Sequence, residues 1–169
     1  MINLKRKLKK FGPLEFLVLS SLLYVVVMLI WTGTTRSEVL QKASDIKSNH
    51  TMVVELINNE VNKCSANMEG KTSWGENCNS SWDSSKIVNY ILNNFKLNNP
   101  YNTKKPLIQT SQDVRIQAEG KAGQSTDKGI IFVSSNNFDS EAGAEWIIGT
   151  CVKSPCVAAG NNELTSVYR

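Results

Sequence analysis

The sequence has little of what most enzymes use for catalysis. It contains one histidine, His50, among 169 residues, and it has no glycine-rich phosphate loop and no Gly-x-Ser-x-Gly nucleophile turn. No pair of carboxylates is marked out by an apolar setting or a motif as a general acid and base. His50 falls within a predicted helix, where we expect a packing or surface role. We therefore expect no catalytic residue, no cofactor and no enzymatic activity.

Beyond residue 31 the sequence also lacks an excess of either charge. Of the 19 lysines and arginines, five precede Thr32, and of the 15 aspartates and glutamates only Glu15 does. The rest of the chain therefore carries 14 residues of each sign, and the net charge of +4 belongs to the amino-terminal segment. A nucleic-acid surface would show as a cationic excess or stripe, so we expect no specific nucleic acid partner.

What the sequence does have is one long apolar run, residues 14–31. Its 18 residues are interrupted only by Glu15, Ser20 and Ser21. At about 1.5 Å per residue, such a helix nearly matches a hydrocarbon core of about 30 Å. A cleaved secretory signal is the alternative, but the run is longer than the usual apolar region and no A-x-A-like cleavage site follows it. The sequence predicts a single membrane span.

The charges around this run predict its orientation. Residues 1–10 form a cationic leader with five lysines and arginines, whereas only Arg36 lies close behind the span. The bias keeps the amino terminus in the cytoplasm and exports residues 32–169. We expect a single-pass protein of the inner (cytoplasmic) membrane.

Residues 11–18, Phe-Gly-Pro-Leu-Glu-Phe-Leu-Val, carry a resemblance to a known family. They resemble the start of a mature type IV pilin or pseudopilin, which begins Phe-Thr-Leu-Ile-Glu and continues as an apolar helix. The resemblance implies that Phe11 is the first mature residue and that prepilin peptidase cuts between Lys10 and Phe11. It also implies that Glu15 is the family glutamate, which pairs with the free amine of a neighbouring subunit during assembly.

Two residues depart from the family pattern. Lys10 stands where the family has a small residue, usually Gly, and Pro13 stands where it has an aliphatic one. A cut after Gly12 restores the glycine but moves Glu15 two positions too early. If the leader is retained, Lys9 or Lys10 of a neighbour is an alternative counter-charge for Glu15. A further alternative is that Glu15 is simply an interfacial acid tolerated near lipid headgroups.

The function implied by the resemblance is structural. The chain would be a subunit of a type IV pilus or related pseudopilus filament, a homo-polymer or a mixture with related pilins, built by inner-membrane assembly machinery. The filament would be extracellular or periplasmic. The alternative is a single-span anchored extracytoplasmic binding domain that does not polymerise.

Helical periodicity continues beyond the membrane span. The apolar residues at three-, four- and seven-residue steps are Val39, Ala43, Ile46, Val53, Ile57 and Val61. We expect one helix over residues 14–63, with 11–31 as the transmembrane or filament-core part and 32–63 as its amphipathic continuation. The alternative is two helices that break at residues 32–35, Thr-Gly-Thr-Thr, because glycine and β-branched residues weaken a helix.

Four cysteines lie in the exported part, where disulfides form. Their spacing favours Cys64 with Cys78 and Cys151 with Cys156, although the other two pairings and a four-cysteine zinc site stay open. The usual two-residue spacings of a zinc site are missing, so we expect no metal. The second pair also resembles the disulfide-closed loop near the carboxyl end of many pilins.

Residues 64–169 are enough for one globular head. We expect a surface loop over 65–85 anchored by Trp74 and Trp82, then a helix that Asp83 caps and that ends near Pro100. Three β-rich segments follow, namely 106–117, 129–134 and 146–152. The predicted fold class is α+β, in which the long helix packs on a small antiparallel sheet, as in a pilin.

Polar residues cluster before the last predicted strand, and pseudopilins have calcium sites in comparable loops. The residues are Asn136, Asn137, Asp139, Glu141 and Glu145. Their spacing matches no defined calcium loop, so we expect a solvated turn.

Overall fold

A computed structural model of the chain describes residues 12–120, 128–136 and 145–169. The chain divides into two compact units, Met1–Leu40 and Gln41–Arg169. Helix α1, Pro13–Ala66, contributes residues to both units. The helix is unbroken through Gly33, which confirms the predicted continuous helix and excludes the alternative of two helices that break at residues 32–35. Hydroxyl groups support this segment, since Thr32 donates to the carbonyl of Met28 at 2.9 Å.

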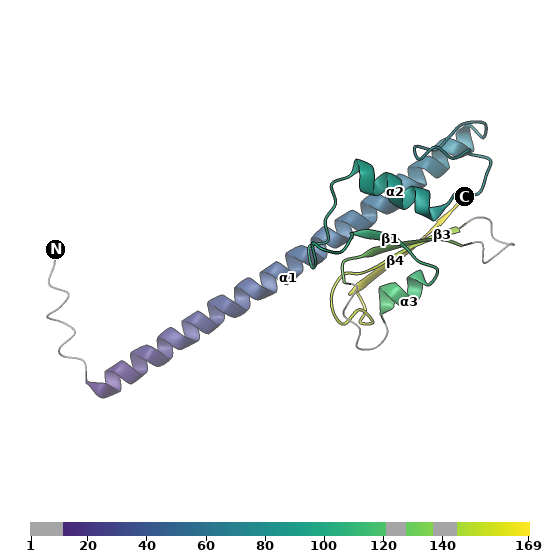
Figure 1. Cartoon of the computed structure of the whole chain (residues 1–169). Helices are drawn as coiled ribbons and strands as arrows, with labels where there is room; N and C mark the ends of the chain where they lie inside the picture. The colour runs from purple at the N-terminus through teal and green to yellow at the C-terminus, as the bar shows by residue number, and fades with distance from the viewer. Residues whose placement is uncertain (1–11, 121–127, 137–144) are drawn as a thin grey trace, which may run out of the picture. The chain divides into compact units, whose positions relative to one another are not determined.

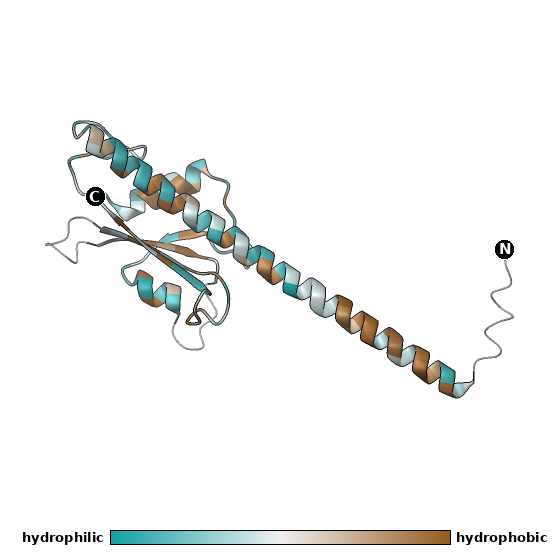
Figure 2. Ribbon diagram, turned by 180° about the vertical axis from the view of Figure 1, so that it is seen from behind, coloured by the Kyte–Doolittle hydropathy of each residue, from teal (hydrophilic) through white to brown (hydrophobic). Residues whose placement is uncertain are grey.

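The described part of the first unit consists of Gly12 and the amino-terminal turns of α1, which are apolar as far as Trp31. In Figure 2 the ribbon of this apolar part is mostly brown (hydrophobic), whereas hydrophilic and hydrophobic residues alternate in the later turns. The large apolar side chains from Leu14 to Trp31 are all exposed. By length and composition this stretch of α1 can cross a membrane.

In the second unit, α1 supplies one buried stripe to the core of the head. Its buried residues are Ala43, Ile46, His50, Val53, Ile57, Glu60, Val61 and Cys64. The three- and four-residue steps place these side chains on one helix face. The apolar members belong to one cluster with residues of α2 and the sheet.

Helix α2, Ser84–Asn94, is the predicted helix after residue 83. Asp83 is its N-cap, and the Asp83 carboxylate accepts from the backbone N–H of Ser85 at 2.8 Å. Ile87, Val88 and Ile91 are buried, so the apolar face packs on the core as expected. The helix ends at Asn94 rather than near Pro100 because Phe95 adopts an extended conformation.

The sheet has four strands in the order β1-β2-β3-β4. Their bounds are Ile108–Thr110, Ile131–Asn136, Glu145–Cys151 and Asn162–Tyr168. The pairs β2–β3 and β3–β4 are antiparallel, but β1 runs parallel to β2, with Ile108 beside Ile131. The sheet is therefore mixed, and the prediction of an antiparallel sheet is wrong for β1.

Two further predictions about the head were wrong. Only three residues of the segment 106–117 form a strand, and Val114–Glu119 is helix α3. The helix forms because Val114 and Ala118, four residues apart, are both buried on one face. Strand β4 was missed because polar residues dominate it, and it owes its position to pairing with β3.

Helices cover both faces of the sheet. Figure 1 shows α2 and α3 on opposite sides of the strands. Ile131, Val133 and Ile148 point into the core shared with α1 and α2, whereas Phe132 packs with Val114 of α3. This alternation is what a strand buried on both faces requires.

Gly149 of β3 lies against α3 at close range. A Cβ atom at this position would lie 2.7 Å from Cγ1 of Val114 and 2.9 Å from Cβ of Ala118. Both distances are below van der Waals contact, so a side chain would push α3 away from the strand. Glycine here is a packing requirement.

We expect Gly149→Ala to lower the free energy of unfolding of the head by about 1–3 kcal/mol, because the added methyl overpacks this contact. Urea unfolding of the detergent-solubilised chain, followed by tryptophan fluorescence, measures the change. Gly33→Ala is the matched control, since a Cβ there has nothing within 4 Å. An unchanged midpoint for Gly149→Ala would contradict the close contact.

Candidate assembly segment and disulfide-closed loops

Glu15 lies in the first turn of α1 and bonds to the residue before the helix. The Gly12 backbone N–H donates to Oε2 of Glu15 at 3.1 Å. Pro13 is the first residue of the helix, where a missing N–H costs nothing. A glutamate that reaches back to the N-cap N–H is one half of a capping box. Pro13 and Glu15 thus both have a local role in starting the helix.

Two other residues of the predicted site lie outside the described residues. These are Lys10 and Phe11, the expected processing junction, together with the leader 1–10. Among the residues that the structure describes, no cation forms an ion pair with Glu15. The hydrogen bond from Gly12 is therefore the interaction that the structure shows for this carboxylate.

Both serines within the apolar segment form hydrogen bonds inside the helix. Ser20 donates to the carbonyl of Leu17 at 2.9 Å, and Ser21 donates to that of Val18 at 2.8 Å. A hydroxyl that bonds its own helix needs no water, so these serines are compatible with an apolar environment.

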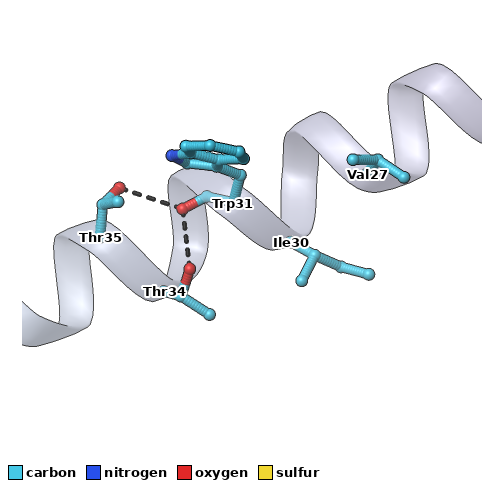
Figure 3. Close-up of a pocket in the computed structure, with 5 residues that line it drawn as sticks. All are labelled: Val27, Ile30, Trp31, Thr34 and Thr35. Atoms are coloured by element: carbon cyan, nitrogen blue, oxygen red, sulfur yellow. Dashed lines mark hydrogen bonds between the residues drawn. The ribbon is translucent and has the colours of Figure 1, made fainter.

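A shallow apolar depression lies at the carboxyl end of this segment. Its lining residues are Val27, Ile30, Trp31, Thr34 and Thr35. Figure 3 shows the Thr34 and Thr35 hydroxyls both directed at the carbonyl oxygen of Trp31, at 2.9 and 3.0 Å. Because these hydroxyls bond the backbone, their methyl groups add to the apolar surface beside the Trp31 ring.

All four cysteines form disulfides, paired as their spacing favours. Cys64 bonds Cys78, with Cα atoms 5.0 Å apart, and Cys151 bonds Cys156, with Cα atoms 5.2 Å apart. A zinc site needs thiolates, so the four-cysteine alternative is excluded. The first bridge ties the end of α1 to the loop before α2.

Two buried glutamates organise the loop that the first disulfide closes. Glu60 of α1 accepts from the backbone N–H of Ser73 at 2.9 Å and from the Ser73 hydroxyl. Burial opposes the charge of Glu60, but these bonds and Lys63 at 3.2 Å outweigh it and lower its pKa below 4.5. Sequence reasoning missed Glu60, although its three-residue step from Ile57 places it on the buried stripe.

Glu76 is the second of these acids and is 8% exposed. Its carboxylate accepts from Nε1 of Trp74 at 3.1 Å and from the backbone N–H of Asp83 at 2.9 Å. It also forms an ion pair with Lys86 at 3.1 Å. One carboxylate therefore joins the loop to the start of α2. No pattern in the sequence pointed to this role.

Aromatic rings link this loop to the sheet. Trp82 stacks on Trp146 of β3 with ring centroids 4.9 Å apart, and Trp74 meets the Trp82 edge at 5.2 Å. The Arg169 guanidinium lies over the Trp82 ring, 4.7 Å from its centroid, and donates to the carbonyl of Ser80 at 2.7 Å. The two predicted aromatic anchors thus both pack as expected: Trp74 contacts Trp82, and Trp82 is buried against Trp146.

Two asparagine side chains form hydrogen bonds that stabilise the second disulfide loop. Asn161 donates to the carbonyl of Pro155 at 2.9 Å, and Asn162 donates to that of Cys156 at 2.6 Å. Tyr101 also reaches this region, since its hydroxyl donates to the carbonyl of Val152 at 2.7 Å. Burial raises the pKa of the Tyr101 hydroxyl, against a smaller opposing effect of Lys42.

The predicted polar turn before β3 falls mainly on residues outside the description. Asn137, Asp139 and Glu141 are not among the described residues. The backbones of Asn136 and Glu145 pair with each other across β2 and β3. Among the described residues, no group of three metal-ligating side chains is present.

Comparisons of the chain with protein-family models, with curated proteins and with solved structures found no match. Any functional assignment therefore rests on the residues and their geometry.

His50 is buried, with 4% of its surface exposed. Its Nε2 lies 3.2 Å from the carbonyl oxygen of Ile148, which fits a neutral imidazole that donates from Nε2. Burial lowers the pKa of His50 below 6.5, against weaker opposing effects of this hydrogen bond and of Glu163. The residue thus has a packing role in the head.

We expect head stability to fall as the pH drops from about 6.5 toward the lowered pKa of His50, because the unfolded chain then binds a proton that the folded chain resists. Urea midpoints at about pH 7.5 and 5.5 measure this loss. His50→Gln keeps a donor for Ile148 and should remove most of the pH dependence. Glu60 does not interfere, since its contribution is lost only below its ordinary value of 4.5. Equal pH dependence in both proteins would contradict the assignment.

Proposed function

We propose that the chain is a structural subunit of a type IV pilus or related pseudopilus filament. The apolar part of α1 would be stored in the membrane and packed among like helices on assembly. The observation that carries this proposal is a continuous exposed apolar surface, residues 14–31, with one acid at its start. The disulfide-bonded head would be displayed outside.

The apolar surface demands a cover that the chain itself does not provide among its described residues. Transferring one Leu, Val, Ile, Phe or Met side chain out of water contributes about 1.5–3 kcal/mol. The segment exposes more than a dozen such groups, including Leu14, Phe16 and Leu17 at 76%, 71% and 68%. Lipid covers them in a membrane, and neighbouring helices would cover them in a filament.

Glu15 places a carboxylate at the start of the apolar surface, and a simple membrane anchor does not need such a group. A carboxylate within lipid or within a helical bundle requires a cation as partner. The Gly12 N–H is a neutral donor, and among the residues that the structure describes no cation pairs with Glu15. The amine of Phe11 in a neighbouring subunit would supply the cation after processing. Lys9 or Lys10 of a neighbour would supply it if the leader stays.

The head supports export and a structural role. Both disulfides belong to an oxidising compartment, which agrees with a cytoplasmic leader and an exported head. The buried stripe of α1 belongs to the core of the head, and the apolar segment belongs to the same continuous helix. One helix would therefore connect the assembly segment to the displayed domain. This arrangement suits a subunit whose head is carried by its packing helix.

A second function remains a candidate on one specific observation. The hydrogen bond between Gly12 and Glu15, with Pro13 at the first helical position, explains both residues as a helix start. Under this alternative the chain is a single-span anchor for an extracytoplasmic binding domain, and Glu15 lies near the headgroups with no partner subunit.

Two substitutions of Glu15 separate these functions. Glu15→Gln keeps an acceptor for Gly12 but removes the charge, whereas Glu15→Ala removes both. In a filament subunit we expect both variants to lose fibres from the sheared fraction while membrane insertion continues. In an anchor, Glu15→Gln should behave as wild type, and Glu15→Ala should lose about 0.5–2 kcal/mol of helix stability.

The controls for this experiment are the amount of each variant in the membrane fraction and Ser20→Ala. Ser20 bonds its own helix, so its replacement should leave fibres intact. Fibres formed normally by Glu15→Gln would refute the charge-partner role of Glu15.

Intact mass spectrometry of the membrane fraction and of sheared material tests processing. We expect sheared fibres to contain a chain that begins at Phe11. Fibres built from chains that begin at Met1 would assign the counter-charge to the leader lysines. Membrane-only protein that keeps Met1 would favour the anchor. In each case the unreduced chain should be lighter than the reduced chain by four hydrogens, because both disulfides are formed.

A further inference from the structure

A pocket of about 400 Å³ lies on the head, between the first disulfide loop and α2. The loop contributes Ser73, Trp74 and Gly75, and the exposed side of α2 contributes mainly asparagines and Tyr90. Asn89, Asn93 and Asn94 fall at helical spacing from Tyr90 and Lys86, so one face of α2 is directed at the loop. The pocket belongs entirely to the second unit.

Two aromatic rings form the apolar part of the pocket. Trp74 and Tyr90 are only partly buried, and their ring centroids are 6.2 Å apart at an interplanar angle of 62°. The Trp74 indole is fixed by its hydrogen bond to Glu76 and by its edge contact with Trp82. A fixed ring is a better binding surface than a mobile one because less conformational entropy is lost on binding.

The polar part of the pocket consists of amides rather than charges. Among the residues that the structure describes, the side chains of Asn89 and Asn93 form no hydrogen bond, and both are exposed. Asn94 uses one donor on the carbonyl of Tyr90 at 2.8 Å. An amide offers donors and an acceptor side by side, which matches hydroxyl groups that both donate and accept.

The pocket carries almost no net charge. Lys86 is its one lining cation, and Lys86 already pairs with the buried carboxylate of Glu76 at 3.1 Å. A phosphate or carboxylate ligand would normally find an unpaired cation or a bidentate arginine. The chemistry of this pocket therefore favours a neutral ligand rich in hydroxyl groups.

The loop side of the pocket is also preformed. The Cys64–Cys78 disulfide closes the loop, Ser73 is bonded to Glu60, and the backbone of Asp83 is bonded to Glu76. These bonds hold Ser73 and Trp74 against α2 without help from a ligand. Packing on the core accounts for the buried parts of Trp74 and Tyr90, and Asn94 bonds to the Tyr90 carbonyl, but neither gives Asn89 and Asn93 a structural role.

We propose that this pocket binds a neutral pyranose sugar. The weakly positive C–H face of the sugar lies on the Trp74 or Tyr90 ring, whose face is negative, and the hydroxyls bond to the Asn89 and Asn93 amides. The site belongs to the head and is independent of filament assembly. It therefore applies equally to a filament subunit and to an anchored domain.

The test uses the full chain in a zwitterionic detergent without a sugar headgroup. The probes are glucose, mannose, galactose and N-acetylglucosamine, each followed by saturation-transfer NMR and by tryptophan fluorescence. We expect at least one of them to bind with a dissociation constant on the order of 1 mM, as is common for a shallow site. Asn89→Ala and Asn93→Ala should each weaken binding about fivefold, the effect of one lost hydrogen bond.

Asn79→Ala is the matched control, because Asn79 is an exposed asparagine of the same region that does not line the pocket. It should bind as wild type. Trp74→Phe keeps an aromatic ring but loses the bond to Glu76, and it should weaken binding and reduce the fluorescence response. Unfolding midpoints like that of wild type show that the asparagine variants are folded.

Three results would overturn the proposal. The first is no saturation transfer from any of the four sugars. The second is equal binding by wild type, Asn89→Ala and Asn93→Ala. The third is binding of inorganic phosphate alone that Lys86→Gln abolishes, which would make the pocket an anion site.

Discussion

The exposure of the apolar amino-terminal part of α1 is the constraint on which the rest depends. A helix whose side chains are apolar on every side is stable in lipid or among other helices, and its serines and threonines already bond to their own backbone. By length and composition this segment can cross a membrane. In the proposed subunit it would be inserted first, and the head would then fold on the exported side. The disulfides, which need an oxidising compartment, agree with this order.

The later part of the same helix packs on the sheet of the head. A small mixed sheet cannot cover both of its faces alone, and here α1 with α2 covers one face while α3 covers the other. Buried polar groups then specify how these layers fit. Glu60 and Glu76 fix the first loop, and His50 bonds α1 to β3. The head thus combines an apolar core with a few directional bonds between neighbouring elements.

The sequence correctly predicted the elements that apolar periodicity and helix capping determine. It found the long helix, its buried stripe, the Asp83 cap and two of the strands. It failed where position depends on tertiary contact. Val114-Arg115-Ile116 fits a strand as well as a helix, and in the structure it begins helix α3, with Val114 and Ala118 packed against Gly149. Glu15 stood out as an acid beside an apolar run. Its bond to Gly12 was not predicted, although the expected helix over residues 14–63 already placed Glu15 in the first turn.

The disulfide between Cys64 and Cys78 also determines how the head would respond to mechanical load. Tension that enters through α1 passes at Cys64 directly across the sulfur atoms to Cys78 and onward to α2, because a covalent bond bypasses the intervening backbone. The residues between them, including Ser73 and Trp74, then carry no tension. If a pull stretched the rest of the polypeptide, the segment closed by this disulfide would keep its shape. The surface formed by residues 64–78 would then be the last part of the loop region to unfold.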